Sequence, residues 1–155
     1  MGTRILLVDD HGIVREGLRS VLEREDDLEV VGEAEDGRGA FSLVGELLPD
    51  IVIMDITMPN LNGVDATRQI VREHANVRVI ALSMHSNRMF VTNMLKAGAS
   101  GYVLKECLAD ELVEAVRTVA GGGWYLSPRI TGVVIDDYVQ HLSDIPTSPI
   151  EHLTP

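Results

Sequence analysis

Residues 51–59 read IVIMDITMP and place the carboxylate of Asp55 directly after four consecutive apolar side chains. A strand that is apolar on both faces belongs inside a sheet covered by helices on both sides, because only that arrangement buries all its side chains. A charge at the end of such a strand is costly to bury and therefore marks a polar site. Asp55 is the first candidate functional residue.

The composition limits the class of protein. The 155 residues are 45% hydrophobic but only 4% aromatic, which suits one globular domain with an aliphatic core and a short appendage. The formal charge of −11 would repel a phosphate backbone, so this chain alone is expected to bind DNA poorly. Cys107 has no second cysteine to pair with, and the N-terminus lacks a signal-peptide layout. The apolar stretches are shorter than the roughly 18 residues of a membrane span, so a soluble, cytoplasmic protein with no membrane partner is expected.

Short apolar runs alternate five times with segments of helical spacing, which predicts strands alternating with helices. The predicted strands cover residues 4–8, 29–32, 51–54, 77–83 and 101–104. Five such units favour an α/β fold of the flavodoxin-like doubly wound kind, with a five-stranded parallel sheet in the order 2-1-3-4-5 and five flanking helices.

The three glycines at 121–123 follow the fifth strand-helix unit and predict the end of its helix, so we assign residues 1–123 to the first domain. Residues 124–142 form a C-terminal extension with one more amphipathic helix, for which Ser127 is the candidate N-cap and Pro128 lies in the first turn. Residues 143–155 are rich in proline, serine and threonine and are expected to form a flexible linker.

Polar residues end four of the predicted strands. In the order 2-1-3-4-5 these ends meet at one edge of the sheet, where ligands of doubly wound folds bind. The edge would hold Asp9, Asp10, Asp55, Ser83 and Lys105. Taken singly, the aspartate pair would be a helix cap, the lysine a solvated loop residue and the serine a satisfied hydroxyl. Their joint position indicates a site.

The carboxylates of this edge predict a metal and a reaction. Carboxylates within about 4 Å of one another repel by a few kcal/mol per pair at an effective dielectric near 20, so a cation is needed. Oxygen ligands without histidine or cysteine favour Mg²⁺, which in turn suits phosphoryl chemistry. Asp55 is then a nucleophile that can form an acyl phosphate. Lys105 and the Ser83 hydroxyl could hold the phosphoryl oxygens, and the backbone carbonyl of Thr57 could bind the metal.

These motifs resemble, over residues 3 to about 121, the receiver domain of two-component response regulators. The residues that carry the resemblance are Asp9-Asp10, Asp55 with Met58-Pro59 and Gly63, Ser83, and Gly101-Tyr102-Val103-Leu104-Lys105. The resemblance implies that a histidine kinase phosphorylates Asp55, with Ser83 and Lys105 holding the phosphoryl group. It also implies a Mg²⁺ site made by Asp10, Asp55 and the Thr57 carbonyl, with Asp9 acting through water. Tyr102 would change rotamer as the phosphoryl group draws Ser83 inward.

The later sequence is similar to the branch of response regulators with a LuxR-type helix-turn-helix output. The similar segments are Ala81-Leu82-Ser83-Met84-His85, Gly98-Ala99-Ser100-Gly101-Tyr102 and Leu153-Thr154-Pro155. The resemblance implies a transcription regulator that dimerises on activation and binds DNA only through a C-terminal domain missing from this chain. One departure is Glu106, which stands where receivers often carry a proline after a cis peptide bond, and which places a negative charge near the site.

The interpretation is a phosphorylation-activated signalling switch that catalyses its own phosphorylation and slow dephosphorylation, and not a metabolic enzyme. Three alternatives stay open. A Mg²⁺-dependent phosphatase with an aspartate nucleophile would usually carry a second aspartate at position 57. A flavin or nucleotide binder would need a glycine-rich loop after the first strand. A pseudo-receiver that signals through contacts alone would not need the complete acidic set.

Overall fold

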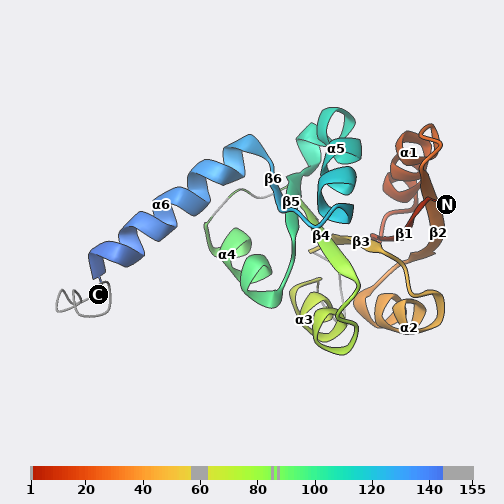
Figure 1. Cartoon of the computed structure of the whole chain (residues 1–155), viewed down its shortest axis with the longest axis horizontal. Helices are drawn as coiled ribbons and strands as arrows, with labels where there is room; N and C mark the ends of the chain where they lie inside the picture. Colours follow the sequence, from red (N-terminus) through yellow and green to blue (C-terminus); the bar gives the residue numbers. More distant parts are fainter. Residues whose placement is uncertain (1, 57–62, 85, 87, 145–155) are drawn as a thin grey trace.

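The computed structural model describes residues 2–56, 63–84, 86 and 88–144 (Figure 1). The strands are β1 Thr3–Val8, β2 Leu28–Ala34, β3 Ile51–Asp55, β4 Arg78–Ser83, β5 Gly101–Leu104 and β6 Tyr125–Leu126. The helices are α1 Gly12–Glu23, α2 Gly37–Leu47, α3 Gly63–Glu73, α4 Arg88–Ala97, η1 Lys105–Cys107, α5 Leu108–Ala120 and α6 Pro128–Asp144.

The strands form one parallel sheet in the order β2-β1-β3-β4-β5-β6. The predicted order 2-1-3-4-5 and the α/β class are therefore confirmed, and a short sixth strand was not predicted. Val8 pairs with Met54, and Asp55 pairs with Leu82. This register brings the carboxyl ends of β1, β3 and β4 to the same edge of the sheet.

The core consists of two layers, one on each face of the sheet, because successive strand side chains point to opposite faces. On one face, Ile5, Ile53 and Val103 pack against α1 and α5. On the other, Leu6, Met54 and Tyr102 pack against α2, α3 and α4, and α6 adds the fully buried Ile130. Figure 1 shows α1 and α5 above the sheet, α2 to α4 below it, and α6 projecting from the β5 side.

Local chemistry explains two helix starts. Asp36 accepts a hydrogen bond from the backbone N–H of Gly39 at 2.8 Å and so caps α2. Gly63 opens α3 against the end of β3, where a Cβ would lie 2.6 Å from the Asp55 carbonyl oxygen and 2.5 Å from Cα of Ile56. Only glycine allows that approach without movement of the backbone that carries Asp55.

The C-terminal helix starts where expected, with Ser127 before Pro128. It runs to Asp144, and the rest of the linker predicted at 143–155 lies outside the described residues. Among the described residues, no helix is both long enough and apolar enough to cross a membrane.

Candidate functional site

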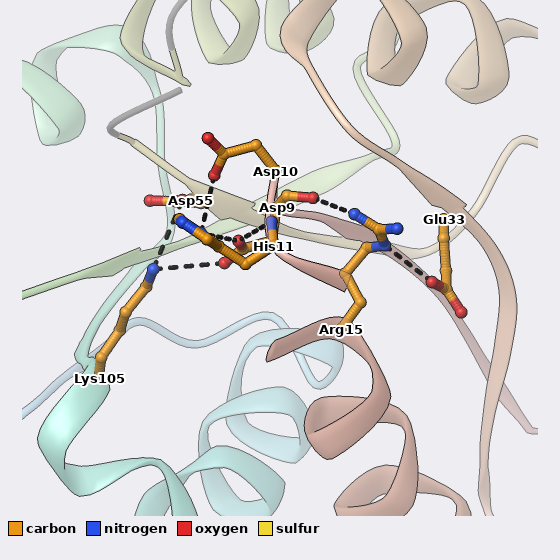
Figure 2. A network of polar contacts seen from close by, with 7 residues as sticks. All are labelled: Asp9, Asp10, His11, Arg15, Glu33, Asp55 and Lys105. Carbon is orange, nitrogen blue, oxygen red and sulfur yellow. Dashed lines mark hydrogen bonds and ion pairs between the residues drawn. The ribbon is translucent and has the colours of Figure 1, made fainter. Parts of the chain in front are cut away.

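Three carboxylates meet at the carboxyl edge of the sheet, as the sequence predicted. Asp9 and Asp10 directly follow β1, and Asp55 ends β3. Together with His11 they form a group whose potential ligand atoms all lie within 4.8 Å of one another (Figure 2). The neighbouring positions of β1 and β3 in the sheet create this group from residues that are more than forty positions apart.

Lys105 lies against this acidic group. Its Nζ is 3.3 Å from Oδ2 of Asp9 and 3.4 Å from Oδ2 of Asp55 (Figure 2). Both aspartate side chains are almost completely buried, at 0% and 1% exposure, whereas that of Lys105 is 18% exposed. One ammonium thus faces two buried carboxylates and a third nearby, which leaves an excess of negative charge in a poorly solvated place.

His11 belongs to the group, although it was not among the predicted site residues. Its backbone N–H donates to Asp9 Oδ1 at 2.9 Å. Its ring Nδ1 lies 3.2 Å from that oxygen and 3.0 Å from Oδ1 of Asp10. The expectation that no histidine stands at the strand ends was therefore wrong for His11. Its position directly after the two aspartates was the available signal.

Arg15 and Glu33 fix the end of β1 from the other side. Arg15 Nη1 donates to the backbone carbonyl of Asp9, and its Nε donates to Oε1 of Glu33 at 2.8 Å (Figure 2). Arg19 also binds Glu33, at 2.7 Å. The hydrogen bonds from Arg19 and Arg15 hold the pKa of Glu33 below its usual range. No spacing in the sequence linked Glu33 to the site, because the contact depends on the pairing of β1 with β2.

The donor set fits a hard divalent cation. Oδ1 of Asp10 is buried and has no hydrogen-bond partner among the described residues, since its contact with His11 lacks hydrogen-bonding geometry. A metal ion would satisfy this oxygen and neutralise the excess charge, and carboxylate oxygens are ligands that Mg²⁺ prefers. Asp10 and Asp55 are placed to coordinate it. The predicted carbonyl ligand, Thr57, lies outside the described residues.

Ser83 ends β4, and Tyr102 is the second residue of the adjacent strand β5, on the same face of the sheet. Both are buried, at 1% and 0% exposure. Burial raises the pKa of the Tyr102 phenol, and a hydrogen bond between its side chain and that of Ser83 offsets this only in part. The serine and tyrosine named from the sequence are therefore in direct contact, in an arrangement that buries the tyrosine.

Glu106 does not crowd the carboxylates. Its Oε2 lies 2.7 Å from Nη1 of Arg129, at the start of α6. The described residues contain no cis peptide bond, so the Lys105–Glu106 bond is trans. The negative charge expected near the site is thus paired with a cation of the C-terminal helix.

Comparison with known proteins places this geometry in a family. Residues 5–117 match the response regulator receiver domain. The chain is 47% identical over 135 residues to the transcriptional regulatory protein DegU of Brevibacillus brevis, an alignment that covers 87% of this chain and 57% of that protein. The chain therefore spans little more than half the length of this relative.

Two solved structures extend the similarity to the fold. A two-component response regulator of the LuxR family from Aurantimonas sp. SI85-9A1 superposes with a TM-score of 0.85 and 41% identity, covering 90% of this chain and 99% of that one. The isolated receiver domain of RcsB from Salmonella enterica serovar Typhimurium, solved with the phosphomimetic BeF₃⁻, superposes with a TM-score of 0.79 and 26% identity. It covers 86% of this chain and 99% of that one.

Proposed function

The chain belongs to the response regulator receiver family, and from this premise we propose that it takes a phosphoryl group from a histidine kinase onto Asp55. The resemblance seen in the sequence, including its LuxR-type branch, is confirmed by the relatives. A receiver is a signalling switch, and the proposal concerns which residues operate this one.

The observation that carries the proposal is the contact of Lys105 with Asp55. The carboxylate is buried at the end of β3, and its Oδ2 lies 3.4 Å from the ammonium. In the proposed step, the other carboxylate oxygen attacks the phosphorus of a phosphohistidine donor. The O–P bond forms as the N–P bond breaks, and the imidazole leaves with its electron pair and is protonated by solvent.

The surrounding residues have separate roles in this step. Lys105 neutralises charge on the phosphoryl oxygens as a point charge, and the Ser83 hydroxyl donates a hydrogen bond to one of them. Asp10, Asp55 and the Thr57 carbonyl would hold Mg²⁺, with Asp9 contributing through water. Bound there, Mg²⁺ would offset the negative charge that gathers during transfer.

The modified state would act through its charge. Phosphorylation adds about −1.5 to −2 units of charge at neutral pH. Drawing Ser83 toward the phosphoryl group would release its hydrogen bond with Tyr102 and change the rotamer of that ring. We further propose that the protein is cytoplasmic and forms a homodimer on activation. DNA would be bound only by a C-terminal output domain, a proposal supported by the likeness to a response regulator of the LuxR family.

Phosphorylation by a small donor tests the assignment. Incubation with Mg²⁺ and phosphoramidate should add the mass of one phosphoryl group to the wild type and none to Asp55→Asn. Asp10→Asn should need far more Mg²⁺ for the same rate. An equal adduct on Asp55→Asn would refute the acceptor, and rapid multiple turnover of a phosphate ester would favour a phosphatase instead.

A further inference from the structure

Ser127 is a fully buried polar residue outside the carboxylate group, and it binds β5 through two different atoms. Its backbone N–H donates to the carbonyl of Tyr102 at 3.0 Å. Its side-chain Oγ accepts from the backbone N–H of Leu104 at 3.1 Å. Leu104 directly precedes Lys105, so Ser127 holds the part of β5 that leads into the lysine of the site.

The hydroxyl of Ser127 is fixed by a third partner. A serine has one hydroxyl proton, which Ser127 donates to Oε1 of Glu111 on α5 at 2.7 Å. The Tyr125 hydroxyl donates to the same oxygen at 2.9 Å. Because the proton is committed to a carboxylate, the lone pairs of Oγ are left to accept from Leu104. A hydrogen bond to a carboxylate is also stronger than one between neutral groups.

Ser127 also begins α6. Its carbonyl accepts the N–H groups of Ile130 at 2.8 Å and of Thr131 at 3.0 Å. The sequence predicted an N-cap serine, and the position is confirmed, but the side chain bonds to β5 and α5. The side chain of Ile130 is fully buried in the same core layer as Tyr102. The first turn of α6 is therefore anchored on the sheet beside the site.

A second contact joins α6 to the other side of Lys105. Arg129 lies in the first turn of α6 and pairs with Glu106 at 2.7 Å. Ser127 binds Leu104, so the residues immediately before and after Lys105 are both held by the start of the same helix. The ion pair is more than half exposed and contributes little by itself. The buried serine is the stronger of the two ties.

We propose that Ser127 is a positioning residue that couples the placement of Lys105 to the docking of the first turn of α6 on the sheet. The consequence for signalling rests on the proposed function, in which Lys105 contacts the phosphoryl group. Coupling of this kind is reciprocal. A shift of Lys105 toward a phosphoryl group changes the docking of the first turn of α6 on the sheet. Conversely, loosening α6 changes the position of Lys105.

Amide hydrogen exchange in the unmodified protein tests the coupling. Ser127→Ala should raise exchange roughly tenfold at Leu104 and also at Ile130 and Thr131, since a buried donor loses its acceptor and the helix start loses its anchor. Tyr125→Phe is the matched control, because it removes the other hydroxyl on Glu111 and leaves the Leu104 contact in place. It should stay near the wild-type pattern. Faster exchange at Leu104 alone, or at Ile130 and Thr131 alone, would overturn the coupling. Faster exchange at all three residues in Tyr125→Phe would overturn it as well.

Phosphorylation kinetics supply the readout that a merely structural role would not change. With phosphoramidate and Mg²⁺, Ser127→Ala should modify Asp55 roughly three- to tenfold more slowly than the wild type, as expected when a catalytic group is misplaced. Ser127→Thr, which keeps the hydroxyl, should recover most of the rate. Tyr125→Phe should be phosphorylated at the wild-type rate, even if it and Ser127→Ala both melt at a lower temperature than the wild type.

The outcomes separate the two proposals. A wild type that accepts no phosphoryl group refutes the proposed function, and the exchange experiment still decides the coupling. A wild-type rate in Ser127→Ala overturns the inference and leaves the acceptor assignment intact. If Ser127→Ala does not fold, Glu111→Ala replaces it, because it removes the acceptor that fixes the Ser127 hydroxyl. It should again raise exchange at Leu104 and Ile130 together, and unchanged exchange there would overturn the inference.

Discussion

Replacing Asp55 by asparagine should stabilise the metal-free protein, although it removes the acceptor. At the 4.8 Å limit of the acidic group, each carboxylate pair repels by about 3.5 kcal/mol at an effective dielectric of 20. Asp55 has two such neighbours, Asp9 and Asp10, which makes about 7 kcal/mol. Its attraction to Lys105 at 3.4 Å is about 5 kcal/mol on the same scale. The substitution should therefore raise the free energy of unfolding by about 2 kcal/mol.

Urea unfolding followed by circular dichroism in EDTA measures this difference. Asp26→Asn is the matched control, since Asp26 is exposed in the turn before β2 and its loss changes the net charge equally. It should have little effect. Adding Mg²⁺ at a hundred times its dissociation constant should stabilise the wild type by about 2.7 kcal/mol. The variant should gain much less, so the order of stability should reverse.

An Asp55→Asn variant no more stable than the wild type in EDTA would refute the reasoning. It would mean that the attraction to Lys105 outweighs the repulsion between the carboxylates. Equal stabilisation of both proteins by Mg²⁺ would show that Asp55 is not a ligand.

Three other perturbations test separate parts of the structure. Gly63→Ala should lower the free energy of unfolding by about 1–3 kcal/mol, because its Cβ would strike the Asp55 carbonyl; Gly17→Ala, with open space around it in α1, should raise it in the same urea titration. Two arginines hold the pKa of Glu33 in the folded protein below its usual range. The ionised carboxylate therefore stabilises the fold at any pH above its pKa in the unfolded chain, and this stabilisation disappears as the pH falls through the lower pKa of the folded protein. Glu33→Gln should therefore be less stable than the wild type at neutral pH, and the gap should narrow in acid; a constant gap down to about pH 3 would contradict this. Burial raises the pKa of the Tyr102 phenol, so this side chain should ionise only above about pH 10. The difference in tyrosinate absorbance between the wild type and Tyr102→Phe during an alkaline titration measures this ionisation.

Much of the fold could be predicted because periodicity is a local property. The apolar run at 51–54 and its counterparts specified five strands, and the order followed from their alternation with helices. The site followed from the same reasoning, since Asp55 ends its strand and Asp9 and Lys105 directly follow theirs, and these strand ends meet at one edge. None of these steps needed a distance between side chains.

The missed features depend on contacts between segments distant in the chain. Strand β6 has only two residues, too few for alternation to be visible, and it forms because Tyr125 and Leu126 pair with β5. The Ser127 hydroxyl was expected to cap its own helix, but it accepts a hydrogen bond from the Leu104 N–H and donates one to the Glu111 carboxylate. The contact between Arg15 and Glu33 likewise exists only once β2 lies beside β1.

The short β6 and the residue after it also protect the sheet from self-association. An apolar edge strand offers unpaired backbone groups on which another chain can add a strand. Here Tyr125 and Leu126 pair with β5, and the Ser127 hydroxyl accepts a hydrogen bond from the Leu104 N–H just beyond them. At the opposite edge, β2 carries the charged side chains of Glu29 and Glu33. A receiver shortened to end at Gly123 would lose these contacts on β5, so we expect it to self-associate more readily than a chain that continues into α6.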